Sequence, residues 1–498
     1  MPDSSLKHNF FFNAIYTASN ALFSLLVFMY VSHVLLPDGR GKVAFAASVT
    51  SYFTMVAMLG IPTYGIRITA QLRDDKERLS RAVQELLIIN AVMSVVSCLV
   101  FLAATHLVPR LREEPLLFLI HSALVLFSFT CIDWLYKGLE QYRFLAVLTV
   151  IYRMVYLALV VLMVRKPSDY IVYGALTVFG PLFVYLVYMV HAGRFISLRP
   201  LGGYHFREHL NKIMVFFAMV CAVSVYTHLD TTMLGFLKTD TDVGYYTVAV
   251  QVKTLLVSVV TSLGAVLMPR ASYYIEQKKW EEFHALGAKG LHFVILFAAP
   301  LVLYFLLFAK EGILFLSGAS YLPSVVPMRI IMPALMLIGL TNILGIQMLV
   351  PLGREKMVFY SVLTGAAVDF VLNLIWIPRY AASGAAAGTV VAEFAVLVVQ
   401  VLALRKEFFS AMRKIPFAQI ALALAAGVLC AFSVKKWGTV LLASWQVSDG
   451  STLHSFLTLL FSALLFFGAY LVVLCFSHEP IVKEAVAYVR TWPGKNKE

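Results

Sequence analysis

Charged side chains interrupt long apolar runs at only a few positions of this 498-residue sequence. Asp230 and Lys253 are two of them, and they lie in the two arms of one predicted helical hairpin at residues 230–272. A charge inside a membrane-length apolar segment is costly, so by default it marks a path for a substrate or an ion. These two residues are therefore the first candidates for a functional site.

Three basic residues are predicted well inside helices: Arg153, Lys253 and Arg329. Arginine presents a planar fork that binds two oxygens of an anionic group, and lysine presents a compact point charge. Each residue could instead pair with a nearby acid or extend to a membrane interface. The sequence leaves both interpretations open for each of the three.

Five acids stand out: Glu85, Asp133, Asp230, Asp369 and Glu393. A buried carboxylate can carry a coupling proton, or it can hold two helices together. We favour the structural role for each of them, and most of all for Asp230, which is predicted near a helix end. Glu85 is predicted at the membrane interface, near the start of its helix.

Uncharged polar residues add a second kind of candidate. On the first predicted helix they recur every three or four residues and form one face: Asn13, Tyr16, Thr17, Asn20 and Ser24. Asn342 and Gln347 occupy the tenth. Such residues can bind sugar hydroxyls or can hydrogen-bond between helices. We favour the first role for Asn20 and Gln347.

The composition tells which elements must position these residues. The chain is 60% hydrophobic and 13% charged, whereas soluble domains are about half apolar and a quarter charged. This predicts an all-α integral membrane protein. The net charge of +13 resides mainly in loops, which indicates membrane topology and no nucleic-acid partner. The five cysteines show no metal-binding spacing.

Apolar runs predict about fourteen transmembrane helices, near residues 10–36, 43–66, 82–106, 115–135, 144–164, 169–191, 213–236, 244–268, 287–308, 324–350, 357–377, 381–404, 416–434 and 454–476. With the N-terminus in the cytoplasm, 26 of the 40 Lys and Arg residues fall on the cytoplasmic side and 11 on the opposite side. This bias predicts that both termini are cytoplasmic.

The chain repeats itself at an offset of about 200 residues. Residues 59–67 read LGIPTYGIR and residues 263–270 read LGAVLMPR, while residues 136–144 and 351–359 both follow a helix end with a basic, aromatic segment. Parallel repeats of this kind are typical of transporters. We predict an N-terminal six-helix bundle at 1–195, a cytoplasmic linker at 196–212, a second bundle at 213–405 and two additional helices with a cytoplasmic tail at 406–498.

Glycine and proline positions and aromatic residues at helix ends give two further structural predictions. Gly60, Pro62 and Pro333 are expected to bend their helices. Four aromatic residues lie at predicted helix ends, where aromatic belts form at membrane interfaces: Trp134, Tyr136, Tyr245 and Tyr246.

Motifs spread over twelve helices now show a family resemblance. They are DWLYKGLE at 133–140, VGYYTVA at 243–249, MPRAS at 268–272, an Asn- and Gln-containing segment at 342–356, and GAAAGTVVAE at 384–393. Together they resemble the polysaccharide-biosynthesis flippases of the MOP (MATE-like) exporter superfamily, the Wzx type. The resemblance implies two six-helix bundles in a V around a central cavity. It also implies outward movement of a polyprenyl-pyrophosphate-linked oligosaccharide across the cytoplasmic membrane by alternating access.

What the resemblance implies sets the remaining expectations. The protein is expected to be a transporter and no enzyme, with no catalytic residue, no metal and no cofactor; a coupling ion, H+ or Na+, is left open. Its expected partners are the lipid-linked oligosaccharide, the bilayer and other polysaccharide-assembly membrane proteins. A lipid II flippase and a MATE-type ion-coupled exporter are the alternatives. A membrane glycosyltransferase or polymerase is least favoured, because no large loop with paired carboxylates is evident.

Overall fold

The computed structural model describes residues 3–262, 264–444 and 451–490, with side chains from residue 22 onward except at 265, 266, 435–444, 485 and 488–490. Within these ranges every regular element is a helix. A helix satisfies its own backbone hydrogen bonds, which is what a segment surrounded by lipid requires. The all-α prediction is thus confirmed.

The chain forms two compact units. Unit 1 consists of the residues up to Thr247 together with Asn373–Ala382, and unit 2 consists of Val248–Leu372 and the chain from Ser383 onward. The predicted bundle boundaries at 195, 213 and 405 rest on the sequence repeat and stay a prediction.

Unit 1 contains α1 (Asp3–Met58), α2 (Ile61–Leu72), α3 (Lys76–Leu107), α4 (Pro109–Arg112), α5 (Pro115–Leu126), η1 (Ser128–Thr130), α6 (Asp133–Gly138), α7 (Tyr142–Met163), η2 (Pro167–Asp169), α8 (Tyr170–Ala192) and α9 (Phe206–Leu237). The next helix, α10 (Asp240–Thr261), begins in unit 1 and continues into unit 2.

The first long helix is two helices joined at a kink. Within α1 the backbone of Leu36 has φ 59° and is followed by Pro37, so the helical hydrogen bonding is broken there. The two arms correspond to the predicted helices at 10–36 and 43–66. The second arm stops at Leu59 (φ 49°) and Gly60 before α2 begins, which confirms the predicted bend at Gly60.

The connection between α8 and α9 is fastened to α3 by two adjacent side chains. The Gln84 amide donates to the carbonyl oxygens of Ser197 (2.7 Å) and Arg199 (2.8 Å). Glu85 accepts from the backbone of His205 at 2.6 Å and lies 2.6 Å from Nε2 of His209. Glu85 is buried because the connection folds back over it; its predicted position at the membrane interface stays a prediction.

The aromatic-belt prediction is wrong for three of its four residues. Trp134, Tyr136 and Tyr246 are buried, whereas Tyr245 is half-buried. Trp134 packs against the Cα of Gly65, where an added methyl group would overlap the indole ring. The Tyr136 hydroxyl donates to the carbonyl of Tyr188 at 2.7 Å. These side chains therefore lock helices of unit 1 together instead of facing the lipid headgroups.

Unit 2 contains most of α10, then α11 (Gly264–Glu276), α12 (Trp280–Leu307), α13 (Ala309–Ser317), η3 (Ala319–Ser324), α14 (Val325–Ile331), α15 (Pro333–Thr341), the π-helix η4 (Asn342–Leu349), α16 (Glu355–Ala403), α17 (Arg405–Lys414), α18 (Phe417–Ser444), α19 (Thr452–Phe476) and α20 (Pro480–Arg490). Residues Asn373–Ala382 of α16 are counted with unit 1.

Two of these helices deviate from a straight α-helix. The pair formed by η3–α14 and α15–η4 is bent by 43°, and Pro333 starts the second arm, as predicted for that residue. The 49-residue α16 contains Ala381 with φ 48°. Like α1, it is a merged pair, and each is long enough for two crossings at roughly 20 residues per crossing.

The length and apolar composition of the described helices are those of a multi-pass membrane protein. Among the described residues, ten helices are long and apolar enough to cross a membrane, and twelve if each of two bent pairs counts as one span. With α1 and α16 each crossing twice, the same helices accommodate the predicted fourteen.

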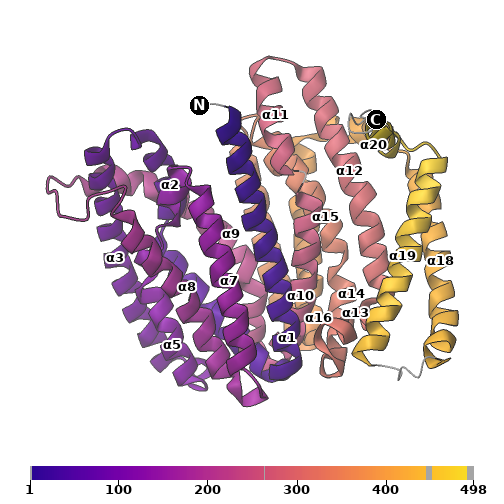
Figure 1. The fold of residues 1–498 in the computed structure, drawn as a ribbon, viewed down its shortest axis with the longest axis horizontal. Coiled ribbons are helices and arrows are strands. Elements are labelled where there is room, and N and C mark those ends of the chain that lie inside the picture. Colours follow the sequence, from indigo (N-terminus) through magenta and orange to yellow (C-terminus); the bar gives the residue numbers. More distant parts are fainter. Residues whose placement is uncertain (1–2, 263, 445–450, 491–498) are drawn as a thin grey trace, which may run out of the picture. The chain divides into compact units, whose positions relative to one another are not determined.

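The two additional C-terminal helices are part of unit 2. In Figure 1 α18 and α19 run side by side, and α19 lies next to α12. Tyr304 and Phe308 near the end of α12 pack with Ala431 of α18 and Phe466 of α19. The Tyr304 hydroxyl donates to the carbonyl of Leu459 at 2.8 Å. This packing joins the extra pair firmly to α12.

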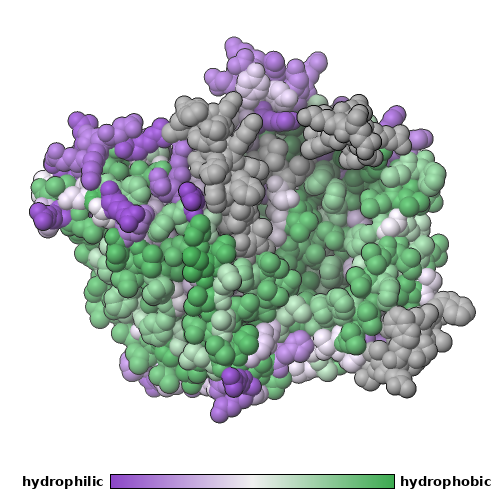
Figure 2. Space-filling view, in the orientation of Figure 1, coloured by the Kyte–Doolittle hydropathy of each residue, from purple (hydrophilic) through white to green (hydrophobic). Residues whose placement is uncertain are grey.

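The surface of each unit has the distribution that a bilayer requires. On the visible face of unit 1 hydrophobic residues cover the middle of the helices, and hydrophilic residues gather at their ends (Figure 2). Large apolar side chains are exposed in both units, among them Val92 and Leu99 on α3 and Leu464 and Leu471 on α19. In water such exposure would be unfavourable, whereas against lipid it is not.

Candidate functional site

A polar cavity of about 390 Å³ lies inside unit 1. We call it the tyrosine pocket, since its wall includes Tyr152 and Tyr156 of α7, Tyr185 and Tyr188 of α8, together with Asp133 of α6 and Arg153 of α7. Its volume is within the range of small-molecule sites, about 300–1,000 Å³. Aromatic faces and charged groups converge on one space here.

Helical spacing explains why the tyrosines gather. Tyr152 and Tyr156 are four residues apart on α7, and Tyr185 and Tyr188 are three apart on α8, so each pair shares one helix face. The rings of Tyr152 and Tyr156 lie 5.7 Å apart. The Arg153 guanidinium carbon lies 5.6 Å from the centre of the Tyr152 ring, within the range of a cation–π contact.

The charges of the tyrosine pocket have opposite signs. Asp133 forms an ion pair with Lys137 at 2.5 Å, one helical turn away. Arg153 is half-buried in the wall. The pocket therefore offers a carboxylate that accepts hydrogen bonds and a guanidinium that donates them.

A second cavity of about 380 Å³ lies in the same unit. We call it the histidine pocket, since His121 of α5 and His228 of α9 line it, with Thr54 of α1 and Ser224 of α9. His121 is only 2% exposed, and its Nδ1 lies 3.2 Å from Oγ1 of Thr50. Among the described residues its Nε2 has no hydrogen-bond partner, and neither has the Thr54 hydroxyl.

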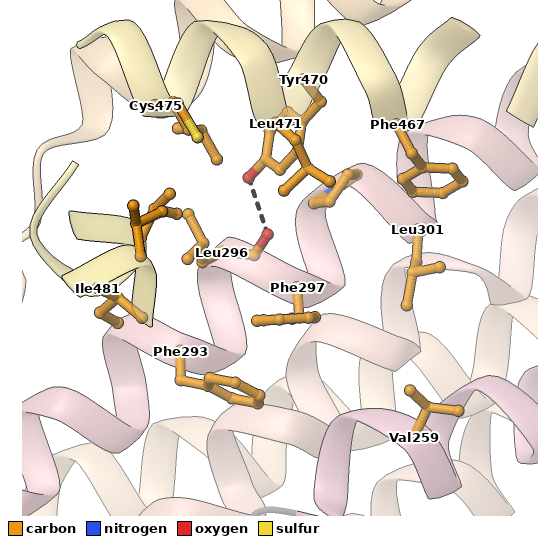
Figure 3. Close-up of a pocket in the computed structure, with 14 residues that line it drawn as sticks. Val259, Phe293, Leu296, Phe297, Leu301, Phe467, Tyr470, Leu471, Cys475 and Ile481 are labelled. Atoms are coloured by element: carbon orange, nitrogen blue, oxygen red, sulfur yellow. Dashed lines mark hydrogen bonds between the residues drawn. The ribbon is translucent and has the colours of Figure 1, made fainter. Parts of the chain in front are cut away.

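A third cavity, of about 810 Å³, lies in unit 2 and is almost entirely apolar. Figure 3 shows that this apolar cavity is framed by side chains of α12 and α19, with Ile481 of α20 and Val259 of α10 completing the wall. The Phe293 and Phe297 rings stack at 4.2 Å. The Tyr470 hydroxyl donates to the carbonyl of Leu296 at 2.8 Å (Figure 3), so the polar end of this phenol is hydrogen-bonded within the wall.

Polar contacts with α12 hold α20 beside the apolar cavity. Glu479, which is fully buried, lies 2.8 Å from Nε2 of His292 and also accepts from the backbone of Val482 at 2.8 Å. One turn away the exposed pair Lys289–Glu484 has a separation of 3.0 Å. These contacts keep Ile481 and Val482 of α20 in the cavity wall.

The predicted cations have different environments. Arg153 lines the tyrosine pocket. Lys253 is half-buried on α10 and is not among the residues that line the three cavities described above. Arg329 is exposed on α14, and its Nε donates to the carbonyl of Leu306 at 3.2 Å. A cation at the C-terminal end of α12 is favourable for that helix, which gives Arg329 a structural contact. Substrate binding by these cations stays a prediction.

The predicted amide Gln347 is buried in the π-helix η4. A methyl group added at Gly264 would lie 2.5 Å from its Nε2 and 2.8 Å from Oδ1 of Asn342. The glycine therefore lets α11 approach η4 closely. Buried π-helical turns often occur at functional sites, but Gln347 faces a neighbouring helix, and its role in substrate binding stays a prediction.

Asp230 is buried in unit 1 between two partners. The Tyr246 hydroxyl donates to one carboxylate oxygen, and the Asn373 amide donates to the other at 2.6 Å. This arrangement joins α9, α10 and α16 and supports a structural role. Whether Asp230 also carries a coupling ion stays a prediction.

For three further predicted residues the structure gives the helix, and for two of them the burial. Asp369 and Glu393 are buried on α16, as expected of acids in apolar runs, and their coupling role stays a prediction. Asn20 belongs to α1, but its side chain lies outside the described ones.

Sequence reasoning missed the tyrosines of the tyrosine pocket and His121. The spacing of Tyr152 with Tyr156, and of Tyr185 with Tyr188, was the available signal, because both pairs place two phenols on one helix face. For His121 no such signal exists, since its surroundings come from α1, α5, α8 and α9.

Two protein-family models and two relatives match parts of this sequence. The sequence model of the family described as polysaccharide biosynthesis protein matches residues 6–275, more than half of the chain, and the MatE family model matches residues 215–375. A protein described as an O-antigen transporter from Escherichia coli (strain K12) is 24% identical over 71% of this chain and 85% of its own length. One from Shigella dysenteriae with the same description is 23% identical over 76% and 95%.

Solved structures share the fold. The lipid II flippase MurJ in an inward closed conformation superposes with a TM-score of 0.73 at 12% identity, covering 93% of this chain and 99% of that one. A multidrug resistance MATE transporter of the MOP superfamily in an inward-facing conformation gives 0.62 at 14% identity, covering 79% and 95%. The match over residues 6–275 and this fold agree with the motif resemblance in the sequence. The chain belongs to the polysaccharide biosynthesis protein family of MOP-type membrane transporters.

Proposed function

We propose that this protein is a flippase that moves a polyprenyl-pyrophosphate-linked oligosaccharide from the cytoplasmic to the outer leaflet of the cytoplasmic membrane, by alternating access. Family membership supports this, and so do the relatives described as O-antigen transporters. Those descriptions also support transport over glycan polymerisation. The substrate would serve surface polysaccharide biosynthesis.

The observation that carries the proposal is a polar, charge-lined cavity inside a unit built of membrane helices. The tyrosine pocket of unit 1 offers Arg153 and Asp133 to polar groups. A polar head group cannot cross hydrocarbon unaided, because its charges and hydroxyls would lose their water. Such a cavity supplies polar partners within the span.

The orientation belongs to the same proposal. Both termini would face the cytoplasm, since Lys and Arg are concentrated in the loops on that side. The buried acids Asp230, Asp369 and Glu393 are the groups to test for a coupling H+ or Na+. Other polysaccharide-assembly proteins of the membrane are the proposed protein partners.

Deletion of the gene tests the proposed function. Polyprenyl-linked repeat units should accumulate on the cytoplasmic face while surface polysaccharide is lost, and a plasmid copy should restore export. Normal glycan export in a clean deletion would refute the proposal. Loss of viability with arrested peptidoglycan synthesis would instead indicate a lipid II flippase, and drug sensitivity with intact surface glycan would indicate a MATE-type exporter.

A further inference from the structure

The tyrosine pocket and the histidine pocket adjoin each other inside unit 1. Thr177 of α8 lines both, and its hydroxyl is turned to the carbonyl of Gly174 at 2.7 Å. The linings of two cavities of similar volume, about 390 and 380 Å³, thus share one side chain. A ligand made of repeated units could place successive units in the two spaces.

The groups of the tyrosine pocket fit a sugar ring better than a phosphate. A pyranose has apolar C–H faces and a rim of hydroxyls, so it can stack on a phenol ring while its rim exchanges hydrogen bonds. Tyr152 and Tyr185 supply rings, Arg153 supplies donors and Asp133 supplies an acceptor. Lys137 already pairs with the Asp133 carboxylate, which can still accept hydrogen bonds from hydroxyls, whereas a phosphate would present no apolar face to the rings.

The histidine pocket contains polar atoms that lack a partner. Nε2 of the buried His121 and the Thr54 hydroxyl make no hydrogen bond among the described residues. Buried polar atoms in native proteins nearly always have one. Thr54 and His121 line the same cavity with Ser224, so a ligand that carries hydroxyls would provide the missing partners.

We propose that unit 1 holds a saccharide-binding site of two adjoining subsites, and that it takes two consecutive pyranose units of the transported head group. The tyrosine pocket stacks one sugar ring and binds its hydroxyls through Arg153 and Asp133. The histidine pocket binds the hydroxyls of the next unit through His121 and Thr54. This inference rests on the proposed function and assigns it a head-group site that does not depend on the pyrophosphate.

The test measures two affinities for the full-length protein in lipid nanodiscs. One probe is the lipid-linked repeat unit extracted from cells that make the surface polysaccharide, and the other is undecaprenyl pyrophosphate without sugar. Tyr185→Ala and His121→Phe should each weaken binding of the glycan-bearing probe by about tenfold, as expected for a lost stacking face or a lost hydrogen bond to a buried group. Binding of the sugar-free probe should change by less than about twofold.

Matched substitutions outside the pockets are the controls. Tyr380→Ala removes a tyrosine that is 62% exposed in unit 1, and His33→Phe replaces an exposed histidine of α1; both should leave the two affinities unchanged. If Tyr185→Ala does not fold, Arg153→Gln takes its place, with the same expected selectivity.

The outcomes separate this inference from the function on which it rests. A wild-type protein that prefers the glycan-bearing probe, with pocket variants that keep this preference, overturns the saccharide site alone. Equal weakening of both probes in the pocket variants also overturns it, since the pockets would then act on the pyrophosphate, on the tail or on the fold. A wild-type protein with no preference between the probes contradicts the proposed function itself.

Discussion

The Asn373 amide donates a 2.6 Å hydrogen bond to the buried carboxylate of Asp230, across 143 residues of sequence. Tyr246 donates to the other carboxylate oxygen. A carboxylate inside a membrane protein is stable only where such donors replace water. This contact also gives a reason why Asn373–Ala382 of α16 is grouped with unit 1.

Replacement of this amide should destabilise the protein. Asn373→Ala removes a donor to a buried charge, for which a loss of about 1.5–3 kcal/mol is expected. Thermal unfolding in detergent should show a lower midpoint, whereas Asn211→Ala, at an exposed position of α9, should leave it unchanged. Equal midpoints for the two variants would show that Asp230 does not depend on Asn373.

The fold was largely predictable because membrane helices are long and apolar. The kink at Leu36 coincides with the end of one predicted helix, and the kink at Ala381 with the start of another. The position of Glu85 was not predictable in this way. Its partner His209 lies 124 residues away, and only the folded connection between α8 and α9 brings the two together.

The candidate site was predictable only where a charge marked it. Arg153 stands out because cations are rare in apolar runs, and it does line a polar pocket. Tyrosines and histidines carry no such mark, since both are common in helix packing. Gln347 shows the converse: a polar residue in an apolar run can pack against a neighbouring helix, here against Gly264 of α11.

Gly264→Ala tests that close approach. The added methyl group would lie 2.5 Å from Nε2 of Gln347, so the amide must move and the thermal midpoint should fall. Because the clash is with the end of a side chain, Gln347→Ala in the same chain should restore part of the loss, and the double-mutant cycle should show a coupling of about 0.5–3 kcal/mol. The matched control is Gly468→Ala in α19, where no atom lies within 4 Å of the new methyl group. Additive effects would mean that Gln347 is not the neighbour that excludes a side chain.

Two polar contacts between α12 and the C-terminal segment should differ in strength. His292→Phe leaves the fully buried Glu479 without the imidazole that lies 2.8 Å from it, and a buried polar group that loses its partner typically costs about 1–3 kcal/mol. Lys289→Ala breaks the pair with Glu484, whose side chains are 62% and 66% exposed, and should cost less than about 1 kcal/mol. Hydrogen exchange of the α20 amides should therefore accelerate strongly in the first variant and little in the second. Similar protection of α20 in both would show that the apolar contacts of Ile481 and Val482 alone hold this helix.

The three predicted cations should contribute unequally to export. Arg153 lines the tyrosine pocket, so Arg153→Gln removes a charged donor from the proposed saccharide site and should lower surface polysaccharide at least about tenfold at equal protein level. Arg329 is exposed and bonded to the carbonyl of Leu306, so Arg329→Gln should leave export within about twofold of wild type. Lys253→Ala distinguishes a role of α10 in the substrate path from a structural one: unchanged export would remove Lys253 from that path. Quantitative immunoblots of surface glycan in a complemented deletion strain provide the measurement. Export that withstands Arg153→Gln but fails with Arg329→Gln would place the essential cation in unit 2 and contradict the assignment of Arg153.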